Sequence, residues 1–232
     1  MRRIVVMLFA FLLVYACKKD EKPNVMYVKG SVSGLKKGTL YLQKQIDSLV
    51  VTVDSVEVND SDEFLLTDVV TSPEMYYVAL AKTDKKIPFF GEKDTVYIST
   101  TLQKFSYKHT ITGSDNQKLL DDYYEIIRKF NNQNLDLQKA GLEARIAGIA
   151  DSIAGVENKK TSLLKKRYLY SINYAINHAD HEVSPYIALT DLVDANPKWL
   201  DSIYNSLTPQ VKKSKYGEEL KTYIVSIKAL ED

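Results

Sequence analysis

The stretch HTITGSDNQKLL, residues 109–120, is where the chain changes its hydrophobic period. Before Gly113, apolar and β-branched residues mostly alternate with polar ones, whereas after Asp115 apolar residues recur at i, i+3, i+4 and i+7. The first period is typical of half-buried strands and the second of amphipathic helices. We therefore expect an α+β protein with a β domain at residues 26–113 and an α-helical domain at residues 114–232.

Short strands are expected on the N-terminal side of this boundary. The connectors at 34–38, 59–62 and 91–94 are rich in residues that tolerate turns. Several short strands at such spacing predict an antiparallel β-sandwich or an open barrel. The predicted strands are residues 27–32, 39–43, 49–58, 64–66, 75–80, 95–98 and 109–112.

A long helical hairpin is expected on the C-terminal side. The first apolar helix face is followed by Asn131-Asn132-Gln133-Asn134, which is predicted to interrupt the helix. A second apolar seam then runs in steps of four and three residues, and its helix continues to His178, although Lys160 and Arg167 break the register. Packing within the chain is favoured over a dimer interface because the facing helix is near. The first face comprises Leu119, Leu120, Tyr123, Ile126, Ile127 and Phe130, and the seam comprises Leu142, Ile146, Ile149, Ile153 and Val156.

Shorter helices are predicted to close the chain. Ser184-Pro185, Asn196-Pro197 and Thr208-Pro209 each pair a capping side chain with a proline suited to the first helical position. A terminal helix is expected over residues 215–230. The residues expected to face inward are Tyr186, Leu189, Leu192, Val193, Trp199, Leu200, Ile203, Leu207, Leu220, Tyr223, Ile224 and Ile227.

The N-terminus is similar to a bacterial lipoprotein signal. Arg2 and Arg3 precede an apolar run at 4–14, which is too short to span a bilayer, and Ala16 stands directly before Cys17. Residues 1–16 are thus expected to be a signal peptide, Cys17 the lipidated residue and 17–25 a solvated tether. Lipidation would also leave the mature chain without a thiol, so disulfides and cysteine-based metal sites are not expected.

Two alternatives remain at this N-terminus. Tyr15 is larger than the residue usual before such a cleavage point, so cleavage by an ordinary signal peptidase stays open. Lys19-Asp20-Glu21 resembles the signal that directs lipoproteins of some Gram-negative groups to the cell surface, although a merely polar tether would carry the same charges. The expected location is the cell envelope, on the outer membrane, either periplasmic or surface-exposed.

The charge balance argues against a nucleic-acid partner. The chain has 31 lysines and arginines against 30 aspartates and glutamates, and removing Arg2 and Arg3 with the signal leaves it close to neutral. Nucleic-acid binding needs a basic excess gathered on one face. The predicted partners are instead the membrane, through the lipid anchor, and a protein or a small ligand of unknown identity.

Two polar clusters were weighed as metal sites. His178 and His181, beside Asp180 and Glu182, have a spacing that could chelate a metal, but the end of a long helix explains them better. The acidic turn at 59–63 could hold Ca²⁺, but an acidic hairpin turn needs no ion. We expect no metal and no cofactor.

No catalytic residue is predicted either. The chain contains no G-x-S-x-G, G-x-G-x-x-G, Walker-type loop or H-E-x-x-H. Asp121 and Asp122 are adjacent on a helix, which is a poor arrangement for paired acid and base work. A non-enzymatic role is expected, with a hydrolase of dispersed catalytic residues kept as the least favoured alternative.

Several runs resemble the β-rich N-terminal domain of unknown function found in envelope-anchored thiol:disulfide interchange lipoproteins of the thioredoxin-like family. The β part of the resemblance rests on 54–64, 73–80 and 111–116, and the helical part on 177–186 and 207–217, which look like the linker of those proteins. In that family a domain with a Trp-Cys-x-x-Cys motif follows, whereas this sequence ends at Asp232. The expected function is a non-catalytic binding or scaffold module, or alternatively an accessory subunit of a thiol:disulfide interchange system.

Overall fold

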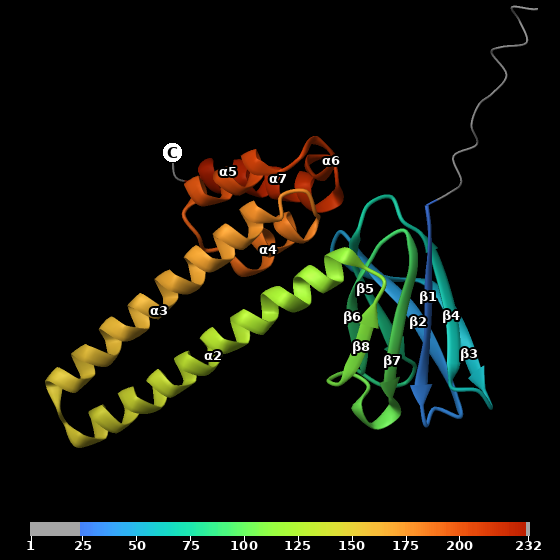
Figure 1. Ribbon diagram of the computed structural model, residues 1–232, viewed down its shortest axis with the longest axis horizontal. Coiled ribbons are helices and arrows are strands. Elements are labelled where there is room, and N and C mark those ends of the chain that lie inside the picture. The colour runs from blue at the N-terminus through green and yellow to red at the C-terminus, as the bar shows by residue number, and fades with distance from the viewer. Residues whose placement is uncertain (1–23, 231–232) are drawn as a thin grey trace, which may run out of the picture.

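The computed structural model describes residues 24–230 and shows a β-sandwich beside a helical unit (Figure 1). The expectations for the signal peptide, Cys17 and Lys19-Asp20-Glu21 lie outside the described residues. The strands are β1 (Val25–Ser33), β2 (Lys37–Ile46), β3 (Leu49–Asn59), β4 (Glu63–Val69), β5 (Glu74–Leu80), β6 (Lys86–Gly91), β7 (Asp94–Thr101) and β8 (His109–Thr112), with a short 3-10 turn, η2 (Leu102–Lys104), before β8.

Two four-stranded sheets form the sandwich, one with the order β4-β1-β7-β8 and the other with the order β3-β2-β5-β6. Strands β1 and β7 run parallel, and the other neighbouring pairs are antiparallel. Alternate residues of both sheets point into a shared apolar core that includes Met26, Leu42, Tyr76, Phe89 and Val96. The predicted α+β class and β-sandwich are confirmed, although the β1–β7 pair is parallel where only antiparallel pairs were expected.

Strand β6 was not predicted, because Pro88 interrupts its hydrophobic run. Proline has no backbone N–H to donate, so it is tolerated mainly on edge strands. β6 is the edge of its sheet, with Pro88 opposite Tyr77 of β5. Ile87 and Phe89 point into the sandwich core, while Phe90 belongs to a second apolar cluster shared with the helices.

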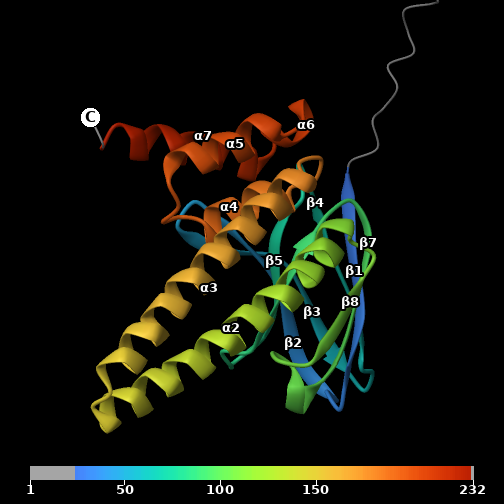
Figure 2. The ribbon, with the colours of Figure 1, turned by 60° about the vertical axis from the view of Figure 1, so that its left-hand side comes forward.

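The helices are α2 (Asp115–Ala147), α3 (Ala150–Asn177), α4 (Val183–Asp191), α5 (Pro197–Ser206), α6 (Pro209–Lys212) and α7 (Lys215–Lys228). α2 and α3 form the long hairpin that projects away from the sandwich (Figures 1 and 2). The chain turns at Gly148, which adopts a left-handed φ of 68°. The predicted interruption at 131–134 is wrong, because these residues continue α2.

The predicted apolar seam is also wrong, because most of its residues face solvent and not the partner helix. Leu142, Ile146 and Ile149 are 60%, 79% and 52% exposed, because the turn at Gly148 separates them from the α3 face that carries Val156. The buried residues near the tip are instead Gly141, Ala144 and Val156. Small residues let the two helices approach closely there.

The capping predictions hold at two of the three proline positions. Asn196 and Thr208 accept hydrogen bonds from the backbone N–H of Lys198 and Val211 at the starts of α5 and α6. The prediction at Ser184 is wrong, since α4 begins earlier, at Val183, and the Ser184 hydroxyl donates to the carbonyl of Ala175 instead.

The short helices pack against the base of the hairpin. Their shared core includes Ile172, Leu192, Leu200, Leu207 and Leu220, as the apolar pattern predicts. The inward prediction is wrong for Trp199 and Val193, which are 46% and 38% exposed. None of the described helices is both long and apolar enough to cross a membrane.

The apolar cluster that contains Phe90 joins the helices to the outer side of β5 and β6. Phe90 and Met75 of the sandwich pack with Leu120, Val183 and Tyr216 of the helical unit. Among the described residues, no helix covers most of the outer face of the other sheet, β4-β1-β7-β8. Its outward side chains are therefore open to solvent, and they form the candidate site.

Candidate functional site

The open sheet face is produced by strict alternation in two neighbouring strands. In β1, Val28 is fully buried while Lys29 is exposed, and in β7 Val96 is fully buried while Tyr97 is 53% exposed. Successive side chains of a strand point to opposite faces. The apolar members thus fill the core, and the remaining members face solvent.

Pairing between strands aligns these outward residues in rows. Lys29 lies opposite Leu65 of β4 on one side and Tyr97 of β7 on the other, and Tyr97 lies opposite Thr112 of β8. The next row holds Glu63, Ser31, Ser99 and Thr110. These two rows therefore combine one phenol and one aliphatic side chain with hydroxyls and one charge of each sign.

A depression of about 740 Å³ lies over these rows. Lys29, Ser31, Glu63, Leu65, Tyr97 and Ser99 contribute to its lining. Leu65 and Tyr97 are about half exposed, at 48% and 53%, so both can contact a ligand. Such a surface can bind by stacking and hydrogen bonding, and this arrangement suits recognition better than acid–base chemistry.

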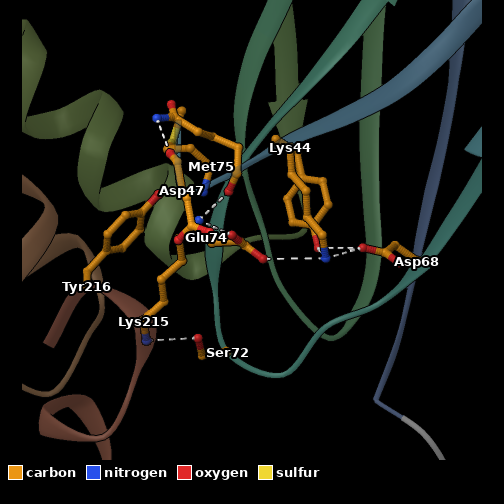
Figure 3. Close-up of polar contacts among 10 residues, drawn as sticks. Lys44, Asp47, Asp68, Ser72, Glu74, Met75, Lys215 and Tyr216 are labelled. Carbon is orange, nitrogen blue, oxygen red and sulfur yellow. Dashed lines mark hydrogen bonds and ion pairs between the residues drawn. The ribbon is translucent and has the colours of Figure 1, made fainter. Parts of the chain in front are cut away.

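A second polar cluster joins the sandwich to the helices (Figure 3). Glu74 of β5 accepts a hydrogen bond from Nζ of Lys215 at 2.5 Å, and its other oxygen lies 3.6 Å from Nζ of Lys44. Lys44 also donates to Asp68 at 2.7 Å. Ser72 accepts a hydrogen bond from the backbone N–H of Lys215 at 3.2 Å. The charges alternate in sign along this chain of contacts.

Two buried tyrosines complete the cluster. The hydroxyl of Tyr76 donates to Asp68 at 2.8 Å, and burial raises the pKa of Tyr76, with the hydrogen bond to Asp68 acting in the same direction. The hydroxyl of Tyr216 accepts the backbone N–H of Met75 at 2.9 Å, and burial raises its pKa as well. Because these groups engage one another, the cluster is best explained as a joint between two units.

Asn116 organises a second joint at the start of α2. Its Nδ2 donates to Glu92 at 2.9 Å and to Glu182 at 3.1 Å, and its Oδ1 accepts from the backbone N–H of Val183 at 2.8 Å. Burial raises the pKa of Glu182, and the nearby charge of Glu92 contributes in the same direction. One amide side chain thus connects the sandwich, α2 and α4.

An acidic cavity of about 610 Å³ lies beside this joint, lined in part by Glu92, Asp121 and Asp122. Burial raises the pKa of Asp121, but its carboxylate accepts a hydrogen bond from Gln117 at 2.8 Å. Glu92 accepts from the backbone N–H of Asp115 as well as from Asn116. Within residues 24–230, no three His, Cys, Asp or Glu side chains are grouped to hold a metal ion.

The two clusters weighed as metal sites have ordinary local contacts. His178 follows the last residue of α3, with its ring 4.3 Å from that of Tyr174, and Nδ1 of His181 lies 2.8 Å from Asp180. Residues 59–63 form the β3–β4 turn, in which Asp60 has a φ of 55° and Ser61 accepts the N–H of Glu63.

The residues of the sheet face were not predicted from the sequence. Their signal was present, because Tyr97 and Lys29 are the polar members of alternating runs that also hold Val96 and Val28. Alternation shows which residues share a face, but it does not show which sheet the helices cover. That information comes only from the packing of Phe90 and Met75 against the helical unit.

Comparison with known proteins places a family match on the sandwich. Residues 26–120 match the family described as Domain of unknown function (DUF4369), a range that spans the sandwich and the first turn of α2. The remainder of the helical unit lies outside this match. The β-rich domain predicted from the sequence is therefore supported as a domain of unknown function.

Other comparisons add little. No curated protein matches the chain. A solved structure titled "pT26-6p" matches with 13% identity and a TM-score of 0.24, covering 84% of this chain and 42% of that one. The present chain thus spans less than half of that protein. A likeness at this level supports no statement about the fold or function of the present chain.

Proposed function

We propose that the chain is an envelope lipoprotein, anchored through Cys17, that acts as a non-catalytic binding or scaffold module. The observation that carries this proposal is the open face of the β4-β1-β7-β8 sheet. Its Leu65 and Tyr97 are half exposed around a depression, while strands β5 and β6 of the opposite sheet are packed against helices. Exposed apolar side chains gathered in one place commonly mark an interaction site.

The anchor would hold this face near the membrane. Strand β1 begins at Val25, eight residues after Cys17. An extended chain spans at most about 3.3–3.6 Å per residue, so the tether reaches roughly 28 Å. A partner of the sheet face would then be a component of the same membrane or of the adjoining space.

The alternative proposal is an accessory subunit of a thioredoxin-like thiol:disulfide interchange system. It is supported by the resemblance of 54–64 and 111–116 to the N-terminal domain of such lipoproteins, and the match of 26–120 to a domain of unknown function is compatible with it. The two proposals share the binding face and differ in the partner. The partner's identity therefore separates them.

Site-specific photocrosslinking in intact cells tests both proposals. A photoreactive phenylalanine analogue would replace Tyr97 on the sheet face or, as the control, Trp199 on α5, which is similarly exposed. A protein captured from position 97 alone supports the binding face, and a captured thioredoxin-like protein supports the accessory role. Equal capture from both positions, or capture from position 199 alone, contradicts the proposed surface.

The anchor is tested separately by Cys17→Ala. We expect this change to move the protein from the membrane fraction to a soluble or secreted fraction while leaving the sandwich folded. Retention of the variant in the membrane fraction would contradict lipidation at Cys17.

A further inference from the structure

A small cavity opens between α2 and α3, partway along the hairpin. Its volume is about 260 Å³. The two helices are close at the tip, where Gly141 and Ala144 are buried, and they separate toward the sandwich (Figures 1 and 2). Larger side chains fill the base, where the rings of Phe130 and Tyr170 lie 6.0 Å apart. The cavity occupies the transition between these two regions.

The polar part of the lining consists of cations and neutral donors. Lys160 and Arg167 come from α3, together with the hydroxyl of Thr161, and the amides of Asn131 and Asn134 come from α2. No acidic side chain is among the described lining residues. Lys160 and Arg167 are seven residues apart, which is about two helical turns, so they lie on the same face of α3.

The nearby carboxylates only partly balance these two cations. Glu157 accepts from Lys160 at 3.1 Å, but the same oxygen also accepts from Arg145 at 3.3 Å. Asp191 lies 3.6 Å from Arg167, beyond hydrogen-bond length, and the same oxygen accepts the hydroxyl of Tyr123 at 2.8 Å. Donors of Arg167 therefore remain available to a ligand.

The surrounding sequence adds further positive charge. The segment from Glu157 to Arg167 contains five basic residues and one acidic residue. The side chains of Lys160 and Arg167 are 25% and 36% exposed, so they are shielded from solvent in part yet still reachable. Partial burial strengthens attraction to an anion relative to a fully exposed surface.

The remaining wall is apolar and consists of Phe130, Leu163 and Leu164. Leu164 is 50% exposed although it borders the cavity. A fully hydrated inorganic anion would gain nothing from such a wall. An anion with an apolar body would cover it and would remove apolar surface from water.

We propose that this cavity binds a small organic carboxylate. Arg167 holds the carboxylate, Asn131 and Asn134 supply amide hydrogen bonds, and the apolar wall contacts the body of the ligand, while Lys160 adds positive charge at the end of the cavity nearer the hairpin tip. The volume is just below the 300–1,000 Å³ range of pockets for drug-sized ligands, which limits the ligand to a small acid or a single terminal residue. The carboxylate could belong to a free acid or to the C-terminus of a peptide. This proposal does not depend on the sheet face.

Binding to the purified full chain can be followed by NMR, using the side-chain amides of Asn131 and Asn134 and the Nε–H of Arg167. The probes are hexanoate and, as a neutral match, hexanamide. A second pair is a short apolar peptide with a free C-terminal carboxylate and the same peptide as its amide. Saturable shifts with hexanoate support a free acid, and saturable shifts with the carboxylate peptide alone support a peptide terminus.

Matched variants locate the interaction. Arg167→Gln should weaken binding at least tenfold, because hydrogen bonds to charged groups are among the strong ones. Lys159→Gln is the control, because Lys159 is adjacent to Lys160 but does not line the cavity. This variant also loses one positive charge, and it should change affinity less than twofold. Asn134→Leu, which fills the cavity without changing charge, should also abolish the shifts. Circular dichroism confirms that each variant is folded.

Three results would overturn the proposal. The first is an equal response to the acids and to their neutral matches. The second is equal weakening by Lys159→Gln and Arg167→Gln, which would indicate general attraction by a basic helix. The third is no saturable shift with either carboxylate at millimolar concentration.

Discussion

Nζ of Lys215 lies 2.5 Å from Oε2 of Glu74, and this contact joins α7 to β5 across 141 positions of the sequence. The same ammonium group donates to the carbonyl of Gln45 at 2.7 Å. Beside it, Tyr216 and Met75 pack in the apolar cluster between the units. At this joint, the sandwich and the helical unit are thus held together both by charge and by apolar contact.

Glu74→Gln should destabilise the fold. The substitution leaves Lys44 and Lys215 beside a neutral group, and removing one partner of a buried pair costs about 3–5 kcal/mol. The side chain of Lys215 is 27% exposed, so solvent reduces the expected loss to roughly 2 kcal/mol. Urea unfolding followed by circular dichroism measures this change.

Asp201→Asn provides the comparison for that prediction. Asp201 pairs with Lys228 at 2.7 Å, but both side chains are substantially exposed. Exposed pairs contribute little, so the variant should stay within about 0.5 kcal/mol of the parent. If Glu74→Gln and Asp201→Asn were equally mild, the joint would not be the stabilising contact inferred here.

Glu182→Gln should stabilise the protein near neutral pH. The pKa of Glu182 is raised in the folded state by burial, so folding disfavours its ionised form. Stability from this group is therefore fully present below the pKa of the unfolded state and is lost as pH rises through the folded pKa. Glutamine keeps an oxygen to accept from Asn116, and the expected gain at pH 7 is roughly 0.5–1 kcal/mol.

The pH profile distinguishes this cause from simple packing. The gain from Glu182→Gln should vanish in acid, where glutamate is protonated in both states. Glu57→Gln, at an exposed position of β3, should show no such dependence. A gain of the same size at pH 3 and pH 7, or a loss at pH 7, would contradict the assignment. Thermal unfolding across that range is the measurement.

Most strands could be predicted because alternation in this chain is strong, but β6 could not. Pro88 lowers the strand propensity of its run, and only the edge position of β6 makes the proline acceptable. The hairpin was predicted, yet its turn was misplaced. Four amides at 131–134 suggested a break, whereas Gly148 makes the actual turn by adopting a left-handed conformation.

The joints between the units could not be read from sequence for a different reason. Asn116 contacts Glu92 and Glu182, which are 24 and 66 positions away. Local patterns carry no information on such distances. The same limit applies to the hairpin cavity, where Lys160 and Arg167 looked like interruptions of a seam and prove to line an opening between helices.

Tyr97→Thr should remove binding without loss of stability. Tyr97 points away from the core, and threonine, which is β-branched, also suits a strand. We expect the free energy of unfolding to change by less than about 1 kcal/mol. Recovery of the partner captured by the wild-type chain should fall at least fivefold in a quantitative pull-down. Unchanged recovery would exclude Tyr97 from the binding surface.

Gly113→Ala and Gly155→Ala should have opposite effects, although the chemical change is the same. Gly113, where the strands give way to helix, has a φ of +91°, and an added Cβ would lie 2.2 Å from the carbonyl oxygen of Thr95. Strain and overlap together should cost at least about 2 kcal/mol.

Gly155 lies within α3 with no heavy atom within 4 Å of an added Cβ, so alanine there should stabilise the helix by about 0.5–1 kcal/mol. For a domain of this size, 1 kcal/mol corresponds to roughly 2–4 °C in Tm, so calorimetry should separate the two variants clearly. A neutral Gly113→Ala would mean that the backbone at the boundary between the two units can relax, and the close approach to Thr95 would then not be required by the fold.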